Sequence, residues 1–496
     1  MNDAQDLYAI LGVPAKASVD DIRRAYRDVT ERLHPNRNPE PAAAAQFRDI
    51  TAAYEVLANE ESRRKYDARR KATPPKQFMS LRVTPSKEVL PAIRESQVLY
   101  LLLELKPNSP DRAKGDQTHL NLTLVLDHST SMKEEKRLDR TKSAAYKIID
   151  SLTPLDFLSV IAFSDHAEVL IEADKVTDRN VMYGPIMAIQ PFGGTEIFQG
   201  LEAAYRENHR NASPRLVNHI ILITDGRTFG DEQACLDLAE QAAKDGIGIS
   251  AMGIGHEWND VFLDQLVARS GGACEFISAS SQVVKFMNDR VRSLGKTFAE
   301  RIVISLAPDP DIKIESVFRL SPDPRPLPTD KDPIALGQMA AMGSISLIVQ
   351  LQIPPSQPVG KRSLVRIDVT SDILLEQALA HKTMADIFGE FADAPVEKDP
   401  PLMILDALGK LTLYRMQDKA QEALARGDVY EATRKLEALA TRLISAGQDE
   451  LAQAAMTEAV RVAQTHEFSA TGQKTLKFGT RLLLAGPQDG VGDSNS

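Results

Sequence analysis

Five side chains of this sequence carry hard oxygen donors and follow apolar runs or glycine turns. They are two carboxylates and three hydroxyls: Asp127, Ser129, Ser131, Thr195 and Asp225. The first carboxylate follows the apolar run 122–126, and the last follows the run 219–224. Such runs are typical of buried strands, and ligands bind at the carboxyl ends of strands in parallel sheets. Because a small hard cation such as Mg²⁺ (or Mn²⁺) prefers octahedral oxygen coordination, these donors predict a metal site.

A second interpretation of the same motif is a helix cap. Asp and Ser accept hydrogen bonds from the free backbone N–H groups of a helix N-terminus, so an isolated D-x-S-x-S is usually a cap. Thr195 and Asp225 follow in the right order on an α/β pattern, and this agreement favours the metal site. Ser131 is expected to cap the next helix as well as to face the ion.

The order of these motifs resembles the metal-ion-dependent adhesion site of von Willebrand factor A-type domains. The resemblance rests on D-x-S-x-S at 127–131, Gly-Gly-Thr at 193–195 and Thr-Asp-Gly at 224–226, and it covers residues 118–296. It implies that Ser129, Ser131 and Thr195 supply hydroxyl ligands and that Asp127 and Asp225 act directly or through water. It also implies that an acidic side chain of a partner protein completes the metal shell.

Residues 1–72 show a helical pattern that resembles a J-domain. Apolar residues recur at helical spacing in 22–33 and 47–57, and the loop between these segments is His34-Pro35-Asn36. The resemblance implies an all-α domain that recruits an ATP-driven heat-shock chaperone of the DnaK class. The basic face of the second helix would contact the chaperone through Arg23, Arg24 and Arg27, although arginines of this kind commonly do no more than solvate a helix face.

The loop departs from the family motif H-P-D, because Asn36 stands where the family has aspartate. Asparagine keeps the shape of the side chain but removes its charge, and a charge-assisted hydrogen bond is roughly twice as strong as a neutral one. We therefore expect weak ATPase stimulation. Two alternatives stay open, a J-like domain kept for docking and one with residual activity.

The rest of the chain predicts a multidomain architecture. A linker at 73–77 leads to strand-like segments in 78–117, which we expect to pair with those in 297–393 in one β-sandwich. The A-type domain, α/β and doubly wound with a mostly parallel sheet, would then be an insertion in this sandwich, similar in layout to the I-like and hybrid domains of integrins. A metal-driven shift of its last helix, around 280–295, would then swing the sandwich. Residues 398–485 predict a helical domain and 486–496 a disordered tail.

Composition excludes several classes of protein. A chain of 496 residues with a net charge of −10 does not favour nucleic-acid binding. Two cysteines, Cys235 and Cys274, make neither a disulfide scaffold nor a zinc site. The sequence lacks a signal-peptide core and any apolar run long enough to span a bilayer, so the prediction is a cytoplasmic protein without membrane contact.

These observations predict a metal-dependent protein-interaction adaptor without enzymatic activity. A first alternative is a J-domain co-chaperone that binds clients through its sandwich or helical domain. A second is a metal-dependent hydrolase, for which His128 is the candidate general base. This second alternative is disfavoured because no acid–base pair accompanies the motif.

Overall fold

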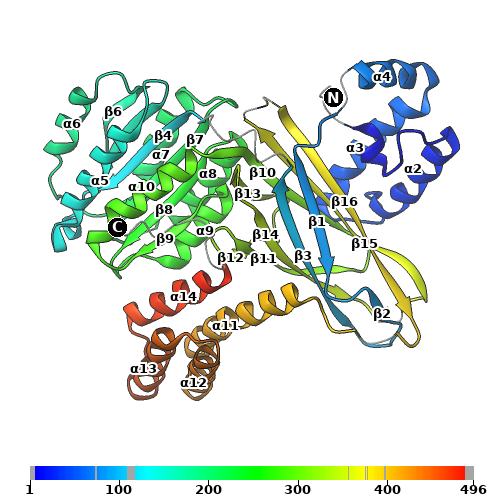
Figure 1. Cartoon of the computed structure of the whole chain (residues 1–496). Coiled ribbons are helices and arrows are strands. Elements are labelled where there is room, and N and C mark those ends of the chain that lie inside the picture. Colours follow the sequence, from blue (N-terminus) through cyan, green and yellow to red (C-terminus); the bar gives the residue numbers. More distant parts are fainter. Residues whose placement is uncertain are drawn as a thin grey trace, which may run out of the picture.

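Three parts are arranged around a central β-sandwich in this computed structural model (Figure 1). The structure describes residues 6–72, 75–108, 118–228, 230–355, 357–374, 376, 378–395 and 398–485. The predicted tail at 486–496 and the first two residues of the linker lie outside these ranges. None of the described helices is long and apolar enough to cross a lipid bilayer.

The N-terminal part is all-helical, as the sequence predicts. Its helices are α1 (Leu7–Leu11), α2 (Val19–Leu33), α3 (Pro41–Ala58) and α4 (Glu60–Ala72). Helix α2 begins with a capping box, in which the Ser18 hydroxyl accepts from the Asp21 backbone and the Asp21 carboxylate accepts from the Ser18 backbone. The apolar faces of these helices meet in one core, in which Ile22 and Leu33 are fully buried.

The sandwich consists of two five-stranded sheets, in the orders β1-β3-β14-β11-β12 and β13-β10-β15-β16-β2. One apolar core lies between the sheets. The strands are β1 (Met79–Pro85), β2 (Val89–Pro91), β3 (Gln97–Pro107), β10 (Thr297–Pro308), β11 (Lys313–Ser321), β12 (Arg325–Leu327), β13 (Ile334–Ala340), β14 (Ile345–Ile353), β15 (Gly360–Ile373) and β16 (Ala378–Ala392). The chain leaves the sandwich after β3 and returns at β10, so the α/β domain is inserted in it.

The inserted domain has a six-stranded sheet in the order β6-β5-β4-β7-β8-β9, covered by helices on both faces. Its strands are β4 (Leu120–Asp127), β5 (Phe157–Phe163), β6 (Ala167–Lys175), β7 (Val217–Thr224), β8 (Gly248–Ile254) and β9 (Cys274–Ile277). Its helices are α5 (Arg137–Ser151), α6 (Arg179–Ala188), α7 (Ile197–Arg210), α8 (Glu232–Lys244), α9 (Asp260–Ser270) and α10 (Val283–Leu294). All pairs are parallel except the edge strand β6, which forms an antiparallel hairpin with β5 and is not among the predicted strands.

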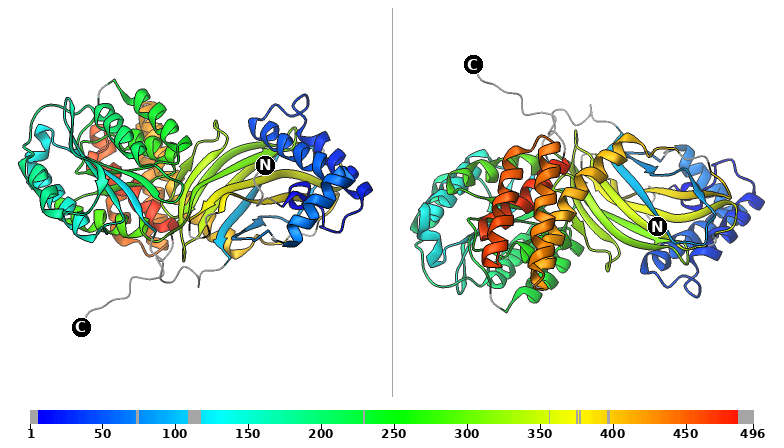
Figure 2. Two further views of the ribbon diagram at one scale, coloured as in Figure 1. Left: turned by 90° about the horizontal axis from the view of Figure 1, so that it is seen from above. Right: turned by 90° about the horizontal axis from the view of Figure 1, so that it is seen from below.

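The C-terminal part is a bundle of four helices (Figure 2, right). They are α11 (Leu402–Ala425), α12 (Val429–Ser445), α13 (Asp449–Thr465) and α14 (Ala470–Ala485). Helix α11 packs on the sandwich, where Tyr414 contacts Phe318. Helix α14 packs on the α/β domain, where Arg481 forms two hydrogen bonds of 2.7 Å with Asp264. The bundle therefore connects the two parts that the insertion already joins.

The J-like domain packs against the sheet that contains β10, β15 and β16. The buried guanidinium of Arg366 donates to the carbonyl of Ile10 at 2.5 Å and to Asp386 at 2.8 Å. The amide of Asn38 donates to the carbonyl of Pro308 at 2.8 Å. The bonds at Ile10 and Asn38 are buried, so they cost more to break than surface contacts, and they hold the J-like domain on the sandwich.

A close backbone contact joins the α/β domain to the sandwich. Gly271 ends α9 with φ +76°, and Gly337 in β13 has φ +79°. A Cβ atom on Gly271 would overlap the backbone nitrogen of Gly337, and a Cβ atom on Gly337 would overlap the carbonyl oxygen of Gly271. Only glycine allows both the left-handed backbone and this approach.

We expect Gly271→Ala to lower the free energy of unfolding by at least about 2 kcal/mol. A left-handed backbone costs a residue with a Cβ atom roughly 1–2 kcal/mol, and the overlap with Gly337 adds to this cost. Thermal and denaturant unfolding of the full chain would measure the change. As a matched control, Gly409→Ala in α11 meets no atom within 4 Å and should be neutral or stabilising by about 0.5–1 kcal/mol. Equal stability of Gly271→Ala and wild type would contradict the argument.

Candidate functional site

The two predicted carboxylates lie at the same edge of the α/β sheet. Asp127 is the last residue of β4, and Asp225 follows the last residue of β7. These strands are parallel neighbours, with Leu126 opposite Ile223. Both carboxylates are fully buried. Parallel neighbours end at one edge of the sheet, so the fold brings together two acidic side chains that are 98 residues apart in the sequence.

The serine hydroxyls join this pair of carboxylates. The Oγ atoms of Ser129 and Ser131 are 3.1 Å apart, and Ser131 donates a hydrogen bond of 2.6 Å to Asp225. Ser129 precedes the kinked 3₁₀ segment η2 (Thr130–Lys136), but its side chain makes no capping hydrogen bond. The prediction that Ser131 also caps a helix is wrong, since Ser129 precedes η2 and Lys136 precedes α5. The two hydroxyls therefore remain directed to the site.

Thr195 lies beside the site, where its side chain is close to Gly226. A Cβ atom on Gly226 would lie 2.7 Å from the Thr195 Oγ1 atom, so Thr195 lies directly against the residue that follows Asp225. The Thr195 loop is fixed to the serine loop by backbone contacts. The carbonyl of Gly193 accepts from both the N–H and the hydroxyl of Thr130, at 3.2 and 3.0 Å. The structure thus brings together all five predicted residues.

Two hydrogen bonds fix the carboxylate of Asp127. One of its oxygens accepts from the Ser129 N–H at 2.8 Å, and the other accepts from the Thr224 hydroxyl at 2.6 Å. Burial raises the pKa of Asp127 to about 6, although both hydrogen-bonding neighbours oppose the rise. Each oxygen keeps one further acceptor position, through which Asp127 can reach an ion or its bound water.

Arg137 is a site residue that the sequence analysis missed. Its guanidinium donates to Asp225 at 2.7 Å and is buried at the start of α5. It also lies 3.5 Å from Glu134, and Gly255 leaves room for it, because a Cβ atom there would be 3.0 Å from the guanidinium. An arginine ten residues after Asp127 belongs to no motif that we recognise, so spacing alone gave no signal.

These donors fit a small hard cation. In the described part of the chain no cluster of three or more histidine, cysteine, aspartate or glutamate side chains could hold a metal ion. The hydroxyls of Ser129 and Ser131 already lie within 3.1 Å of each other beside a carboxylate. Hydroxyl, carboxylate and water oxygens are the ligands that Mg²⁺ and Mn²⁺ accept.

The predicted chaperone-contact residues are accessible. Arg23, Arg24 and Arg27 are exposed on α2, and Pro35 and Asn36 are exposed in the following loop. The imidazole of His34 is half-buried. It packs edge-on against Phe47 and its Nδ1 atom accepts from the Asn36 N–H at 3.2 Å. This turn geometry does not use the Asn36 side chain, so replacing aspartate by asparagine leaves the loop intact.

The same loop is bounded by two residues that bind the sandwich. Arg32 donates to Asp386 at 3.1 Å, and Asn38 donates to the Pro308 carbonyl at 2.8 Å. They lie two residues before His34 and two residues after Asn36. The loop is therefore fixed close to the sandwich surface, a placement that local sequence patterns do not predict.

Family models match three segments of the chain. They are the DnaJ domain at 6–67, the von Willebrand factor type A domain at 121–290, and the Sll0103-like C-terminal alpha-helical domain at 402–486. The chain therefore carries a DnaJ domain, a von Willebrand factor type A domain and a C-terminal helical domain of the Sll0103-like kind. This result confirms the predicted multidomain fold class.

Two relatives share parts of this organisation. The uncharacterized protein sll0103 of Synechocystis is 32% identical over 261 residues, which cover 50% of this chain and 61% of that protein. The human DnaJ homolog subfamily B member 11 is 53% identical over 64 residues, or 13% of this chain and 18% of the homolog. The chain thus spans less than two thirds of the length of these curated relatives.

Two solved structures share the fold over most of the chain. A von Willebrand factor type A protein from Catenulispora acidiphila superposes with a TM-score of 0.65 at 15% identity, over 81% of this chain and 96% of that one. The ArnB paralog VWA2 from Sulfolobus acidocaldarius gives a TM-score of 0.55 at 13% identity, over 82% and 99%. At these identities the two matches show a shared fold.

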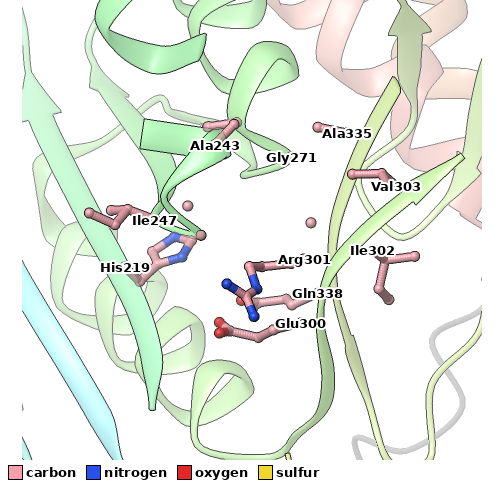
Figure 3. Close-up of a pocket in the computed structure, with 14 residues that line it drawn as sticks. His219, Ala243, Ile247, Gly271, Glu300, Arg301, Ile302, Val303, Ala335 and Gln338 are labelled. Atoms are coloured by element: carbon pink, nitrogen blue, oxygen red, sulfur yellow. The ribbon is translucent and has the colours of Figure 1, made fainter. Parts of the chain in front are cut away.

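A crevice lies between the α/β domain and the sandwich. This crevice of about 60 Å³ is lined by residues such as His219, Gly271, Glu300 and Arg301 (Figure 3). Burial raises the pKa of Glu300 well above its usual value and lowers the pKa of His219 well below its own. In both groups burial therefore favours the neutral form over the charged one.

We expect Glu300→Gln to stabilise the protein above pH 5 and to be nearly neutral at pH 4. Glu300 is 6% exposed, and its folded pKa lies above its unfolded pKa. The stability that this group contributes is therefore present below the unfolded pKa, near 4.5, and is lost as the pH rises toward the folded pKa. The difference between variant and wild type should reach about 1 kcal/mol or more by pH 8.

Denaturant unfolding between pH 4 and 8 measures this difference. The exposed Glu437→Gln in α12 adds the same chemical change at the surface and should leave the pH profile as in wild type. A Glu300→Gln profile parallel to that of wild type would show that Glu300 is ionised in the folded protein.

Proposed function

We propose that this chain is a metal-dependent adaptor that captures an acidic side chain of a partner protein. The proposal rests on the convergence of Asp127, Ser129, Ser131, Thr195 and Asp225 at one edge of the α/β sheet. The ion, Mg²⁺ or Mn²⁺, would supply the positive charge that binds a carboxylate of the partner. The chain itself has a different task, which is to orient the hydroxyls and to balance two buried carboxylates.

Each site residue has a role that follows from its contacts. The hydroxyls of Ser129, Ser131 and Thr195 would bind the ion directly. Asp127 already accepts two protein hydrogen bonds, so it suits indirect contact through water. Arg137 neutralises one oxygen of Asp225 and would leave the other oxygen for the ion or for Ser131.

A second part of the proposal concerns the DnaJ domain, which would bring a DnaK-class chaperone to the captured partner. The exposed face with Arg23, Arg24 and Arg27 and the exposed loop at 34–36 support this role. The neutral Asn36 removes a charge from the contact, so we infer that docking dominates over ATPase stimulation.

Two other functions account for fewer observations. A co-chaperone that binds clients through its sandwich or helical bundle would leave the five converging donors without a role. A hydrolase would need a general base, and the candidate His128 engages its Nδ1 atom with the Gln190 carbonyl at 2.9 Å. A carbonyl only accepts, so Nδ1 donates this bond and Nε2 keeps its lone pair; the hydrolase is disfavoured because, among the described residues, no carboxylate hydrogen-bonds the ring to complete an acid–base pair.

We expect Mg²⁺ or Mn²⁺ to raise the melting temperature of the full chain and to be required for partner capture. A ligand that binds only the folded state at 100 times its Kd adds about 2.7 kcal/mol. Thr195→Ala removes one direct ligand, and losing about 1.4 kcal/mol would raise the metal Kd about tenfold. Scanning calorimetry across a metal titration measures both effects.

Thr441→Ala in α12 is the matched control, because this exposed hydroxyl bonds only the Glu437 carbonyl of its own helix and belongs to the helical bundle. Pull-downs from source cells with Mg²⁺, with chelator and with Asp225→Ala then test capture. A partner retained under all three conditions would contradict the metal-dependent mechanism. A melting temperature that metal does not change would show that the site binds no ion.

We expect Asn36→Asp to increase stimulation of a DnaK-class ATPase. The restored carboxylate would turn a neutral contact into a charge-assisted one, and a gain of about 1.4 kcal/mol lowers the half-saturating concentration about tenfold. Steady-state ATP hydrolysis with purified chaperone measures it. Asn59→Asp adds the same charge at another exposed position of the domain and should change nothing. Equal rates for wild type and Asn36→Asp would assign the domain to docking without stimulation.

A further inference from the structure

Two arginines of the sandwich are buried with no described carboxylate in hydrogen-bonding contact. Arg319 in β11 and Arg325 in β12 stand directly opposite each other in the antiparallel ladder, and each is 2% exposed. Like charges at directly opposite positions destabilise a sheet. An arginine side chain stays protonated in proteins, and burying an unpaired charge costs several kcal/mol. Such a pair needs a compensating partner.

Among the described residues no carboxylate bonds either guanidinium, and Asp323 acts on both only at longer range, where its charge opposes the lowering of their pKa by burial. All three guanidinium nitrogens of Arg325 lack a hydrogen-bond partner, and so does the Nε atom of Arg319. Arg319 has one bond, of 3.1 Å, to the carbonyl of Leu336. Among the described residues, no carboxylate forms an ion pair with either guanidinium and no aromatic ring lies beneath one. The pKa of Arg319 is lowered to about 9, first by burial and then by Arg325.

Nearby acidic groups are already engaged. Asp323, in the turn between β11 and β12, lies 3.9 Å from Arg290 of α10. Asp264 binds both Arg481 and Lys477 of α14. These cationic residues come from the α/β domain and the helical bundle, so the excess of positive charge collects where three parts of the chain meet.

Two other buried arginines of this protein do have carboxylate partners. Arg366 is also 2% exposed, yet it bonds both Asp386 and the Ile10 carbonyl. Arg481 forms a bidentate pair with Asp264. The Nε atoms of Arg366 and Arg481 are also unbonded, so what distinguishes Arg319 and Arg325 from them is the missing carboxylate partner.

We propose that Arg319 and Arg325 bind a small inorganic anion at this junction. Chloride and inorganic phosphate share the required chemistry, which is a compact negative charge that accepts several N–H bonds. The bound anion would neutralise the opposed guanidinium groups and, through Arg290, link the last helix of the α/β domain to the sandwich. This site is separate from the metal site and does not depend on it.

Thermal unfolding of the full chain tests this proposal. The buffer is sodium gluconate at constant ionic strength, into which chloride or phosphate is exchanged in separate titrations. The wild-type melting temperature should rise saturably by roughly 2–5 °C in the anion that fits. The arm that saturates at the lower concentration identifies which of the two anions is preferred.

Two variants separate anion binding from general salt effects. Arg325→Met should fold, because replacing an unpaired buried charge by an apolar side chain is often neutral or stabilising. It should equal or exceed wild type in gluconate and lose the anion response. Arg366→Met breaks a satisfied pair, so it should be less stable but keep the full response.

Crystals grown in bromide give a direct readout, with an anomalous peak expected between the two guanidinium groups. A wild-type melting temperature that is equal in gluconate, chloride and phosphate would overturn the proposal. So would a response that persists in Arg325→Met.

Discussion

Both ends of the inserted domain are tied together where they meet the sandwich, and the rest of the molecule depends on this constraint. The N–H and hydroxyl of Thr118, just before β4, both donate to the carbonyl of Gly295, just after α10, at 3.3 and 3.2 Å. The first strand and the last helix of the domain therefore share one anchor. The glycine contact between α9 and β13 adds a second point of attachment, and the helical bundle adds a third.

Charged pairs lie at the joints between the parts. Lys382 pairs with Asp49 of the J-like domain, Lys477 pairs with Asp260 of the α/β domain, and both lysines are largely buried. Such pairs cost desolvation energy and repay it only with good geometry, so they favour one relative orientation of the parts over others. The Arg137–Asp225 pair applies the same principle inside a single domain, where it holds the strand-end carboxylate in one position before any ion arrives.

The spacing of residues along the chain predicted the features that depend on residues close together in the sequence. The apolar runs before Asp127 and Asp225 gave the central strands, and the parallel topology then placed both carboxylates at one edge. The edge strand β6 was missed because it is half-exposed and carries charged residues at 168, 172, 174 and 175, which hide its apolar face. Arg137 and Arg325 could not be predicted, since their importance comes from neighbours supplied by distant segments. The docking of the J-like domain is likewise a long-range property.

The direction of β4 has a consequence for how the two ends of the molecule could work together. This strand begins two residues after the Thr118 anchor and runs away from the sandwich, so Asp127 lies roughly 20 Å from that joint. The J-like domain lies on the opposite side of the sandwich (Figure 1). Anything held at the strand ends is therefore separated from anything recruited by the loop at 34–36, and packed strands set the spacing in place of a flexible tether. This fixed spacing favours an elongated or partly unfolded polypeptide, which can contact both ends at once, over a small compact one.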